Sequence, residues 1–179
     1  MYTRWAECTC PSDTTLLYDG IIVQAANILT NLLCIPKAST LSNQSDATST
    51  TPTTTPPSHI TRMEPLLYTN QMGITDAIPC ALCHVSNHSM VFTFSGMTTC
   101  PGSWTRQYSG YLTTSYEFST TDVVCADERL SREIQWRDAS TGAVVRNGVN
   151  MLETVCGEGV ASCQGYEAGQ LMPCVVCSN

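Results

Sequence analysis

Cys80, Cys83 and His84 form the segment Cys-Ala-Leu-Cys-His, which has the spacing by which haem is attached to c-type cytochromes. In that chemistry the two thiols bond to the porphyrin vinyl groups, and the histidine becomes an axial ligand of the iron. The same two cysteines with His84 and His88 would also give zinc an acceptable set of ligands. The segment therefore raises three interpretations, which are a haem carrier, a zinc site and a pair of disulfide-bonded cysteines.

An internal repeat favours the disulfide interpretation. Residues 9–21 and 99–111 place cysteine, proline, tyrosine and glycine in one register, as Cys10, Pro11, Tyr18 and Gly20 in the first copy and Cys100, Pro101, Tyr108 and Gly110 in the second. Each copy then ends in Pro-Cys-x-x-Cys, at 79–83 and 173–177, and Ser178 stands where the first copy has His84. A haem site needs its histidine, whereas a disulfide-bearing strand does not, so we expect no cofactor.

Eleven cysteines in 179 residues indicate an oxidising compartment, because this density is rare in reducing compartments outside metal sites. Eight of the cysteines match between the copies, as Cys10 with Cys100, Cys34 with Cys125, Cys80 with Cys174, and Cys83 with Cys177. Cys156 and Cys163 occur only in the second copy and are close enough to join across a short glycine-containing loop. Cys8 is left over, since Thr98 takes its place in the repeat, and we predict an interchain disulfide there.

The charge distribution disfavours two classes of partner. The formal net charge is −7, with only eight lysines and arginines and no basic cluster, which argues against nucleic acid and against an acidic membrane surface. No apolar run approaches the roughly 20 residues needed to span a bilayer. The first ten residues lack the apolar stretch of a secretory signal, so we expect either a leader removed before residue 1 or a fragment of a longer chain.

The sequence offers little catalytic chemistry, and we predict that the protein is not an enzyme. It contains no GxSxG, HExxH, phosphate-binding GxxxxGK[ST] or EF-hand motif, and no acidic pair with the spacing of an acid and a base. A cysteine nucleophile would have to be unpaired, and nothing near Cys8 in the sequence would activate its thiol.

The residue patterns predict an all-β fold of two homologous, disulfide-linked subdomains, at residues 1–83 and 84–179. Short runs rich in β-branched and aromatic residues predict strands at 16–23, 81–85, 89–94, 106–118, 122–127 and 172–177. Weak helical periodicity indicates two possible short helices, at 25–33 and 127–136. His84 and His88 are expected to flank a hairpin turn rather than to line a pocket.

Residues 38–60 interrupt the first subdomain with a stretch composed almost wholly of serine, threonine, proline and small polar residues. Such a stretch cannot bury enough apolar surface to fold alone, so we expect a surface loop with the composition of an O-glycosylated stalk. The candidate O-glycosylation sites are Thr48, Thr50, Thr51, Thr53, Thr54 and Thr55. Asn43 and Asn87 begin Asn-x-Ser sequons and are candidates for N-glycosylation.

An ordered set of motifs resembles the globular C-terminal region of the short-chain, spongin-type collagens. The motifs are YTRWAECTCPSDTTLLYDGI, LLCIPK, IPCALCHVS, TTCPGSWTRQYSGYL, VVCADE, ETVCG and MPCVVCSN. More distantly, the doubled pattern is similar to the tandem non-collagenous domain that ends basement-membrane collagens. The resemblance implies two like β subdomains and the disulfides Cys10–Cys83, Cys34–Cys80, Cys100–Cys177, Cys125–Cys174 and Cys156–Cys163. No Gly-X-Y repeat is present, so this chain cannot itself form a triple helix.

These features together predict a secreted structural protein that self-associates into a matrix or filament and carries glycans. The segment Tyr2, Thr3, Arg4 and Trp5 corresponds to 92–95 in the repeat, and we expect it to be an assembly strand that pairs with or exchanges into a neighbouring copy. An alternative function is a carbohydrate-binding module in which Trp5, Trp104 and Tyr108 stack on sugar rings. A c-type haem protein is the third and least favoured interpretation.

Overall fold

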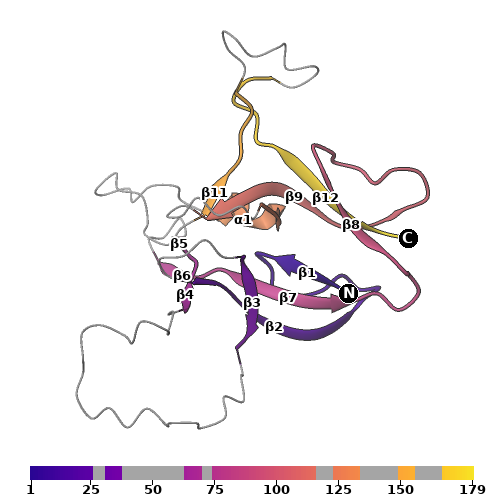
Figure 1. The fold of residues 1–179 in the computed structure, drawn as a ribbon, viewed down its shortest axis with the longest axis horizontal. Coiled ribbons are helices and arrows are strands. Elements are labelled where there is room, and N and C mark those ends of the chain that lie inside the picture. The colour runs from indigo at the N-terminus through magenta and orange to yellow at the C-terminus, as the bar shows by residue number, and fades with distance from the viewer. Residues whose placement is uncertain (26–30, 38–62, 70–73, 116–122, 134–148, 156–166) are drawn as a thin grey trace.

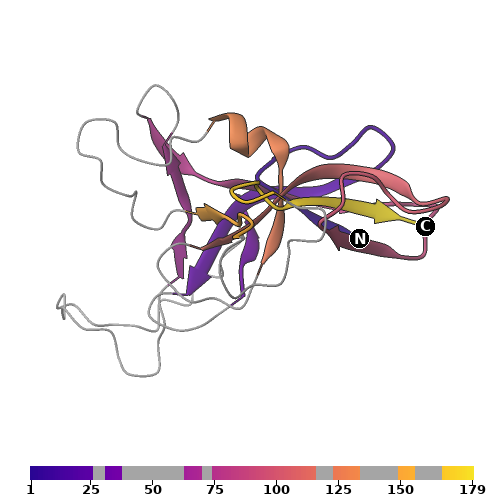
Figure 2. The same cartoon turned by 90° about the horizontal axis from the view of Figure 1, so that it is seen from above.

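The computed structural model describes residues 1–25, 31–37, 63–69, 74–115, 123–133, 149–155 and 167–179 (Figure 1). This part of the chain is all-β, and its only helix is α1 (Glu128–Glu133). Eight strands form one continuous path through the main sheet, namely β1 (Tyr2–Trp5), β2 (Thr15–Ala25), β3 (Leu33–Pro36), β7 (Pro79–His84), β8 (Val91–Ser95), β9 (Thr105–Ser115), β10 (Val124–Asp127) and β12 (Pro173–Ser178). Both termini lie at the same end of the molecule in the two views (Figures 1 and 2).

The order of the strands is β3-β2-β7-β1-β10-β9-β12-β8. The first half of the chain contributes β3-β2-β7-β1 and the second half contributes β10-β9-β12-β8. In both halves the third strand is followed by the second strand, then by the last and then by the first. The short strands β4 (Met63–Pro65) and β11 (Val149–Met151) pair with the ends of β2 and β9, respectively. Strands β5 (Leu67–Thr69) and β6 (Thr75–Ala77) form a separate antiparallel pair. Apart from that pair, each strand of the first half has a counterpart strand in the second half.

The pairing registers also match between the halves. Gly20 lies opposite Cys80, as Gly110 lies opposite Cys174, and both long strands have a register shift shortly before the glycine. Each first strand is followed by a residue with positive φ, Ala6 at 68° in the first half and Gly96 at 75° in the second. The left-handed conformation is unusual for alanine, so its recurrence at this position indicates that the turn geometry itself is required.

Among the described residues, four disulfides tie the strands together, two in each half. They join Cys10 with Cys83, Cys34 with Cys80, Cys100 with Cys177, and Cys125 with Cys174, and these are the pairings that the collagen resemblance implies. The expected Cys156–Cys163 disulfide lies outside the described residues. Because Cys80 and Cys83 are both disulfide-bonded, neither thiol is available to porphyrin or zinc, and the haem and zinc interpretations of this segment are wrong.

The repeated Tyr-x-Gly motif fixes the strand beside it. The Tyr18 hydroxyl donates to the Cys34 carbonyl oxygen over 2.9 Å, and the Tyr108 hydroxyl donates to that of Cys125 over 2.8 Å. A Cβ atom on Gly20 would lie 1.9 Å from the carbonyl oxygen of Ile35, and one on Gly110 would lie 1.7 Å from that of Ala126. The glycine of the motif therefore allows the neighbouring strand to come close, and the tyrosine hydroxyl holds that strand in place.

Replacing Tyr108 with phenylalanine is expected to lower the free energy of unfolding by about 1–3 kcal/mol, because it leaves a buried carbonyl without its donor while keeping the ring. Tyr18→Phe, which removes the equivalent bond at a half-buried position, is the matched control and should cost less. Urea denaturation without reductant measures both. Equal costs for the two variants would show that burial does not set the strength of this bond.

The helix expectations are only partly met. At 25–33, Ala25 ends β2 and Leu33 begins β3, while residues 26–30 lie outside the described part. The helix prediction is therefore wrong at both ends of that segment, where pairing within the sheet outweighs a weak helical preference. The expected helix at 127–136 is present in part as α1.

Candidate functional site at the junction of the two halves

Strand β1 lies in the interior of the sheet and joins the two halves. It pairs antiparallel with β7 over its whole length and parallel with β10 through Trp5 and Ala126. The expected assembly strand Tyr2–Trp5 is therefore not an open edge, because both of its sides are already occupied by the same chain. Among the described strands, β3 and β8 end the sheet.

A buried ion pair crosses this junction. The Arg4 guanidinium donates from Nε and Nη2 to Asp127 Oδ2 over 2.9 Å and 2.6 Å, and from Nη1 to the Thr9 carbonyl oxygen over 2.9 Å. Its carbon Cζ lies 5.7 Å from the centroid of the Tyr108 ring. Asp127 also accepts from the Arg129 backbone N–H over 3.1 Å and so caps the N-terminus of α1. The pair holds β1, the following loop and α1 in one arrangement.

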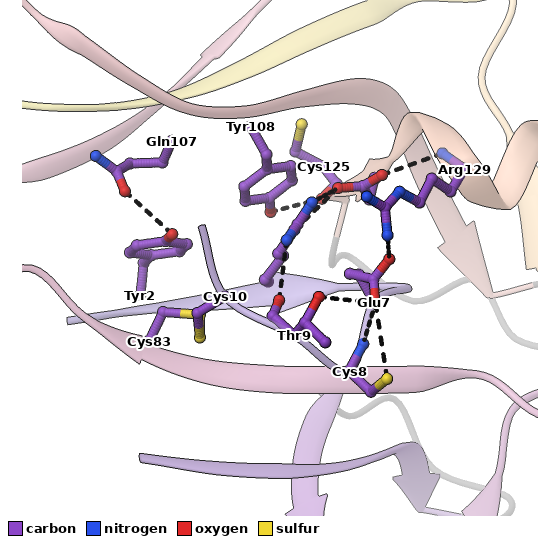
Figure 3. A network of polar contacts seen from close by, with 12 residues as sticks. Tyr2, Glu7, Cys8, Thr9, Cys10, Cys83, Gln107, Tyr108, Cys125 and Arg129 are labelled. Atoms are coloured by element: carbon purple, nitrogen blue, oxygen red, sulfur yellow. Dashed lines mark hydrogen bonds and ion pairs between the residues drawn. A yellow bond between two sulfur atoms is a disulfide. The ribbon is translucent and has the colours of Figure 1, made fainter. Parts of the chain in front are cut away.

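Glu7 supplies a second set of contacts across the junction (Figure 3). Its Oε1 accepts from the Cys8 backbone N–H over 2.9 Å and from the Thr9 hydroxyl over 3.2 Å, and its Oε2 accepts from the Arg129 guanidinium. The Cys8 thiol lies 3.7 Å from Oε1. Cys8 is half-buried and is the one free cysteine among those that the structure describes, and its predicted interchain disulfide stays a prediction.

The Glu7 contacts predict a loss of stability in acid. Burial of the carboxyl opposes its ionisation, but Arg129, the Thr9 hydroxyl and Arg4 outweigh it and hold the pKa of Glu7 below its ordinary value. The stabilisation is present above the unfolded-state pKa, about 4.5, and is lost as pH falls through the lower folded-state value. We expect Glu7→Gln to lose less stability than wild type between pH 5 and pH 3 in urea titrations, and equal losses would contradict this role.

Two stacked tyrosines fill the centre of the junction. The rings of Tyr2 and Tyr108 have centroids 6.1 Å apart, and the Tyr2 hydroxyl donates to Gln107 Oε1 over 3.2 Å (Figure 3). Burial raises the pKa of Tyr2 to about 12 and raises the pKa of Tyr108 further above its usual value. Tyr108 is core, so the expectation that it stacks on a sugar is wrong.

The junction contains two ion pairs, Arg4 with Asp127 and Glu7 with Arg129. The charged groups named above are each engaged by a partner of the opposite charge. In the described part of the chain, no three histidine, cysteine or acidic side chains are placed to hold a metal ion. His84 is exposed at the end of β7, and His88 follows the turn at 86–87. The hairpin expected here is wrong, because β7 pairs with β1 and β2 while β8 pairs with β12.

No protein-family model matches this chain. Its four disulfides are typical of secreted or extracellular proteins. In the part of the chain that the structure describes, no helix is long and apolar enough to cross a membrane.

Of the predicted glycosylation sites and sugar-stacking residues that remain, some lie in the described part of the chain and others outside it. Asn87 is exposed in the turn between β7 and β8, and its N-glycosylation stays a prediction. Asn43 and the six candidate threonines of the insertion lie outside the described residues. Trp5 and Trp104 are half-buried, and Trp104 contacts Phe94 edge to face with centroids 5.5 Å apart.

The sheet ends carry an apolar surface that sequence reasoning missed. On β8, Phe92 is 55% exposed, and its ring contacts Phe94 with centroids 5.0 Å apart. At the other end, Leu33 and Ile35 of β3 are 49% and 38% exposed. The alternation of apolar residues in both segments was visible in the sequence, but only the strand order shows that these strands are the ends.

Proposed function

We propose that the chain is an extracellular structural module that arose by internal duplication and self-associates into a matrix or filament. The matching strand orders and registers support the duplication, and the resemblance to the C-terminal region of spongin-type collagens agrees with it. The four disulfides suit a module that must persist outside the cell. No catalytic role is part of this proposal.

The exposed edge strand β8 is the observation that carries self-association. A strand at the end of a sheet presents unpaired backbone N–H and C=O groups, and natural monomers usually protect such an edge with charged residues or proline. The sequence of β8 is Val-Phe-Thr-Phe-Ser, which has neither, and its outer side has no partner strand among the described residues. An apolar edge of this kind is suited to pairing with another chain.

Sedimentation velocity over a wide concentration range tests the proposal. We expect oligomers whose proportion rises with concentration, and we expect Thr93→Lys, on the exposed edge, to shift the population toward monomer. Thr105→Lys, at an exposed position on the inner strand β9, is the matched control and should leave the distribution unchanged. A wild-type protein that stays monomeric at high concentration would overturn the proposal.

Glycosylation is a separate part of the same proposal, since a decorated 38–60 segment would keep the surface hydrated while β8 associates. Intact-mass measurement of the protein from its natural source should exceed the 19.4 kDa of the chain by sugar-sized increments. Treatment with a peptide N-glycosidase assigns the share carried by Asn43 and Asn87. A single mass equal to that of the bare chain would remove this part of the proposal.

A further inference from the structure

We propose that the second half of the chain carries a pocket that binds a positively charged group at the end of an apolar stem, as in an arginine or lysine side chain or a free alkylamine. Among the described residues, the pocket is lined by Asn150, Met151, Glu153 and Leu171. Its volume of about 440 Å³ lies in the range of sites that hold small ligands. Binding here is independent of the proposed self-association, because the pocket lies outside β8.

Two segments of the chain build the pocket, at 149–155 and 167–172. They rise side by side from the sheet, in orange and yellow in Figure 1. The Met172 N–H donates to the Leu152 carbonyl oxygen over 2.7 Å and joins the two segments at their base. Backbone hydrogen bonding therefore fixes the walls of the pocket relative to each other.

The two polar side chains of the pocket have no partner in the described part of the chain. No ion pair or hydrogen bond there involves the Glu153 carboxylate or the side-chain amide of Asn150. Both residues are exposed, whereas Met151 is half-buried and Leu171 is 37% exposed. A carboxylate and an amide oxygen are thus free beside two apolar side chains.

This lining favours a cation with an apolar stem over other ligands. An ammonium or guanidinium group can donate to the Glu153 carboxylate and to the Asn150 amide oxygen, while its stem contacts the apolar walls. A wholly apolar ligand would desolvate the carboxylate without pairing it. An anion would find no cationic side chain among the described lining residues. The net charge of −7 also attracts cations.

The first half of the chain has an equivalent of this segment. The Leu66 N–H donates to the Ile22 carbonyl oxygen over 2.9 Å, and the Leu152 N–H donates to that of Leu112 over 2.9 Å. Ile22 and Leu112 hold the same position in the two long strands, since they lie opposite the matching cysteines of β3 and β10. Leu66 and Leu152 are therefore equivalent, and so are the residues that follow them.

The residues that follow differ in charge between the halves. Leu67 lies opposite Ala77 in the first half, and Glu153 lies opposite Leu171 in the second. Leu67 is half-buried, whereas Glu153 is exposed. Since the same backbone pairing forms with leucine in the first half, the fold does not require the carboxylate of Glu153.

A titration followed by nuclear magnetic resonance tests the pocket in the oxidised full chain. The probes are butylguanidinium, butylammonium, 1-butanol and butyrate, which have similar stems and differ in charge. We expect saturable shifts of the Met151 and Leu171 methyl signals with the two cations. The alcohol and butyrate should bind about tenfold more weakly, or not at all, because neither forms a charge-assisted hydrogen bond with the carboxylate.

Two variants remove the carboxylate in different ways. Glu153→Gln keeps the size of the side chain, and Glu153→Leu copies the first half at Leu67. Both should weaken binding of the cations by about tenfold, since each removes the charged acceptor. Both should keep the urea midpoint of wild type, because the position is exposed. Asp13→Asn, at an exposed position outside the pocket, is the matched control and should leave the affinity unchanged.

Two larger probes distinguish the sources of the cation. They are a blocked peptide with one arginine between glycines, and spermidine. Binding of either supports the pocket, and the tighter of the two identifies the source as a protein side chain or a free amine. An equal loss of affinity in Glu153→Gln and Asp13→Asn would show a diffuse attraction of cations to an acidic protein and would overturn the pocket. Methyl signals of Met151 and Leu171 that no cation shifts would also overturn it.

Discussion

Gly110→Ala is expected to abolish stable folding, or to lower the free energy of unfolding by more than about 4 kcal/mol, the upper end of what single substitutions do. The added Cβ would lie 1.7 Å from the carbonyl oxygen and 2.7 Å from the carbonyl carbon of Ala126. Both are backbone atoms of a strand that is held by the Cys125–Cys174 disulfide and by the Tyr108 hydroxyl, so neither can move aside. The clash therefore has to be relieved by separating β9 from β10.

The yield of oxidised, monomeric protein and its urea midpoint measure this effect. Gly102→Ala is the matched control, because Gly102 has a φ of +54° but nothing within 4 Å of its added Cβ. That variant should cost only about 1–2 kcal/mol, the strain of the left-handed conformation. A Gly110→Ala protein within about 1 kcal/mol of wild type, the size of an ordinary substitution, would show that β10 does not pass against this glycine.

Arg4→Met is the second large effect, with an expected loss of about 3–5 kcal/mol in the free energy of unfolding. The substitution keeps most of the side-chain volume but leaves Asp127 as an uncompensated charge that is only 3% exposed. Breaking a buried pair in this way costs more than the pair itself contributes, because the remaining charge stays desolvated.

The double variant Arg4→Met with Asp127→Asn separates the two contributions. The asparagine keeps an acceptor for the Arg129 N–H and so preserves the helix cap, while it removes the stranded charge. We expect it to recover much of the stability lost in Arg4→Met, as measured in the same urea titrations. A double variant less stable than the single would mean that packing of the guanidinium, rather than its charge, holds the junction.

Much of the fold could be predicted because the signals are local. Alternating β-branched and aromatic residues marked the strands, and the spacing of Cys-Pro, Tyr and Gly marked two halves with one register. The disulfide pairs followed from a resemblance, since cysteine spacing alone allowed other pairings. The helix expected at 25–33 was wrong because the end of β2 and the start of β3 are set by pairing with other strands.

The junction could not be predicted from the sequence. Arg4 and Asp127 are 123 residues apart, and no local pattern relates a cation near residue 1 to an aspartate before a short helix. The same reason explains why Tyr2–Trp5 was expected at an open edge, because only the three-dimensional order of strands tells an inner strand from an edge. Exchange of this strand into a neighbouring copy stays a prediction. The repeat gives 92–95 as the counterpart of Tyr2–Trp5, and this counterpart lies in β8 at the end of the sheet.

The disulfides also limit how far the molecule can be stretched. Cys10–Cys83 and Cys100–Cys177 each bypass most of one half, so the covalent route from residue 1 to residue 179 runs through 1–10, 83–100 and 177–179 only. At about 3.5 Å per residue, this route extends to roughly 110 Å, against roughly 630 Å for the reduced chain. Under tension, β1 and β8 would be pulled out of the sheet, and extension would then stop. The two disulfides would shield the rest of each half from the force. Such a chain is a short, stiff tether, and reduction would turn it into a long, compliant one.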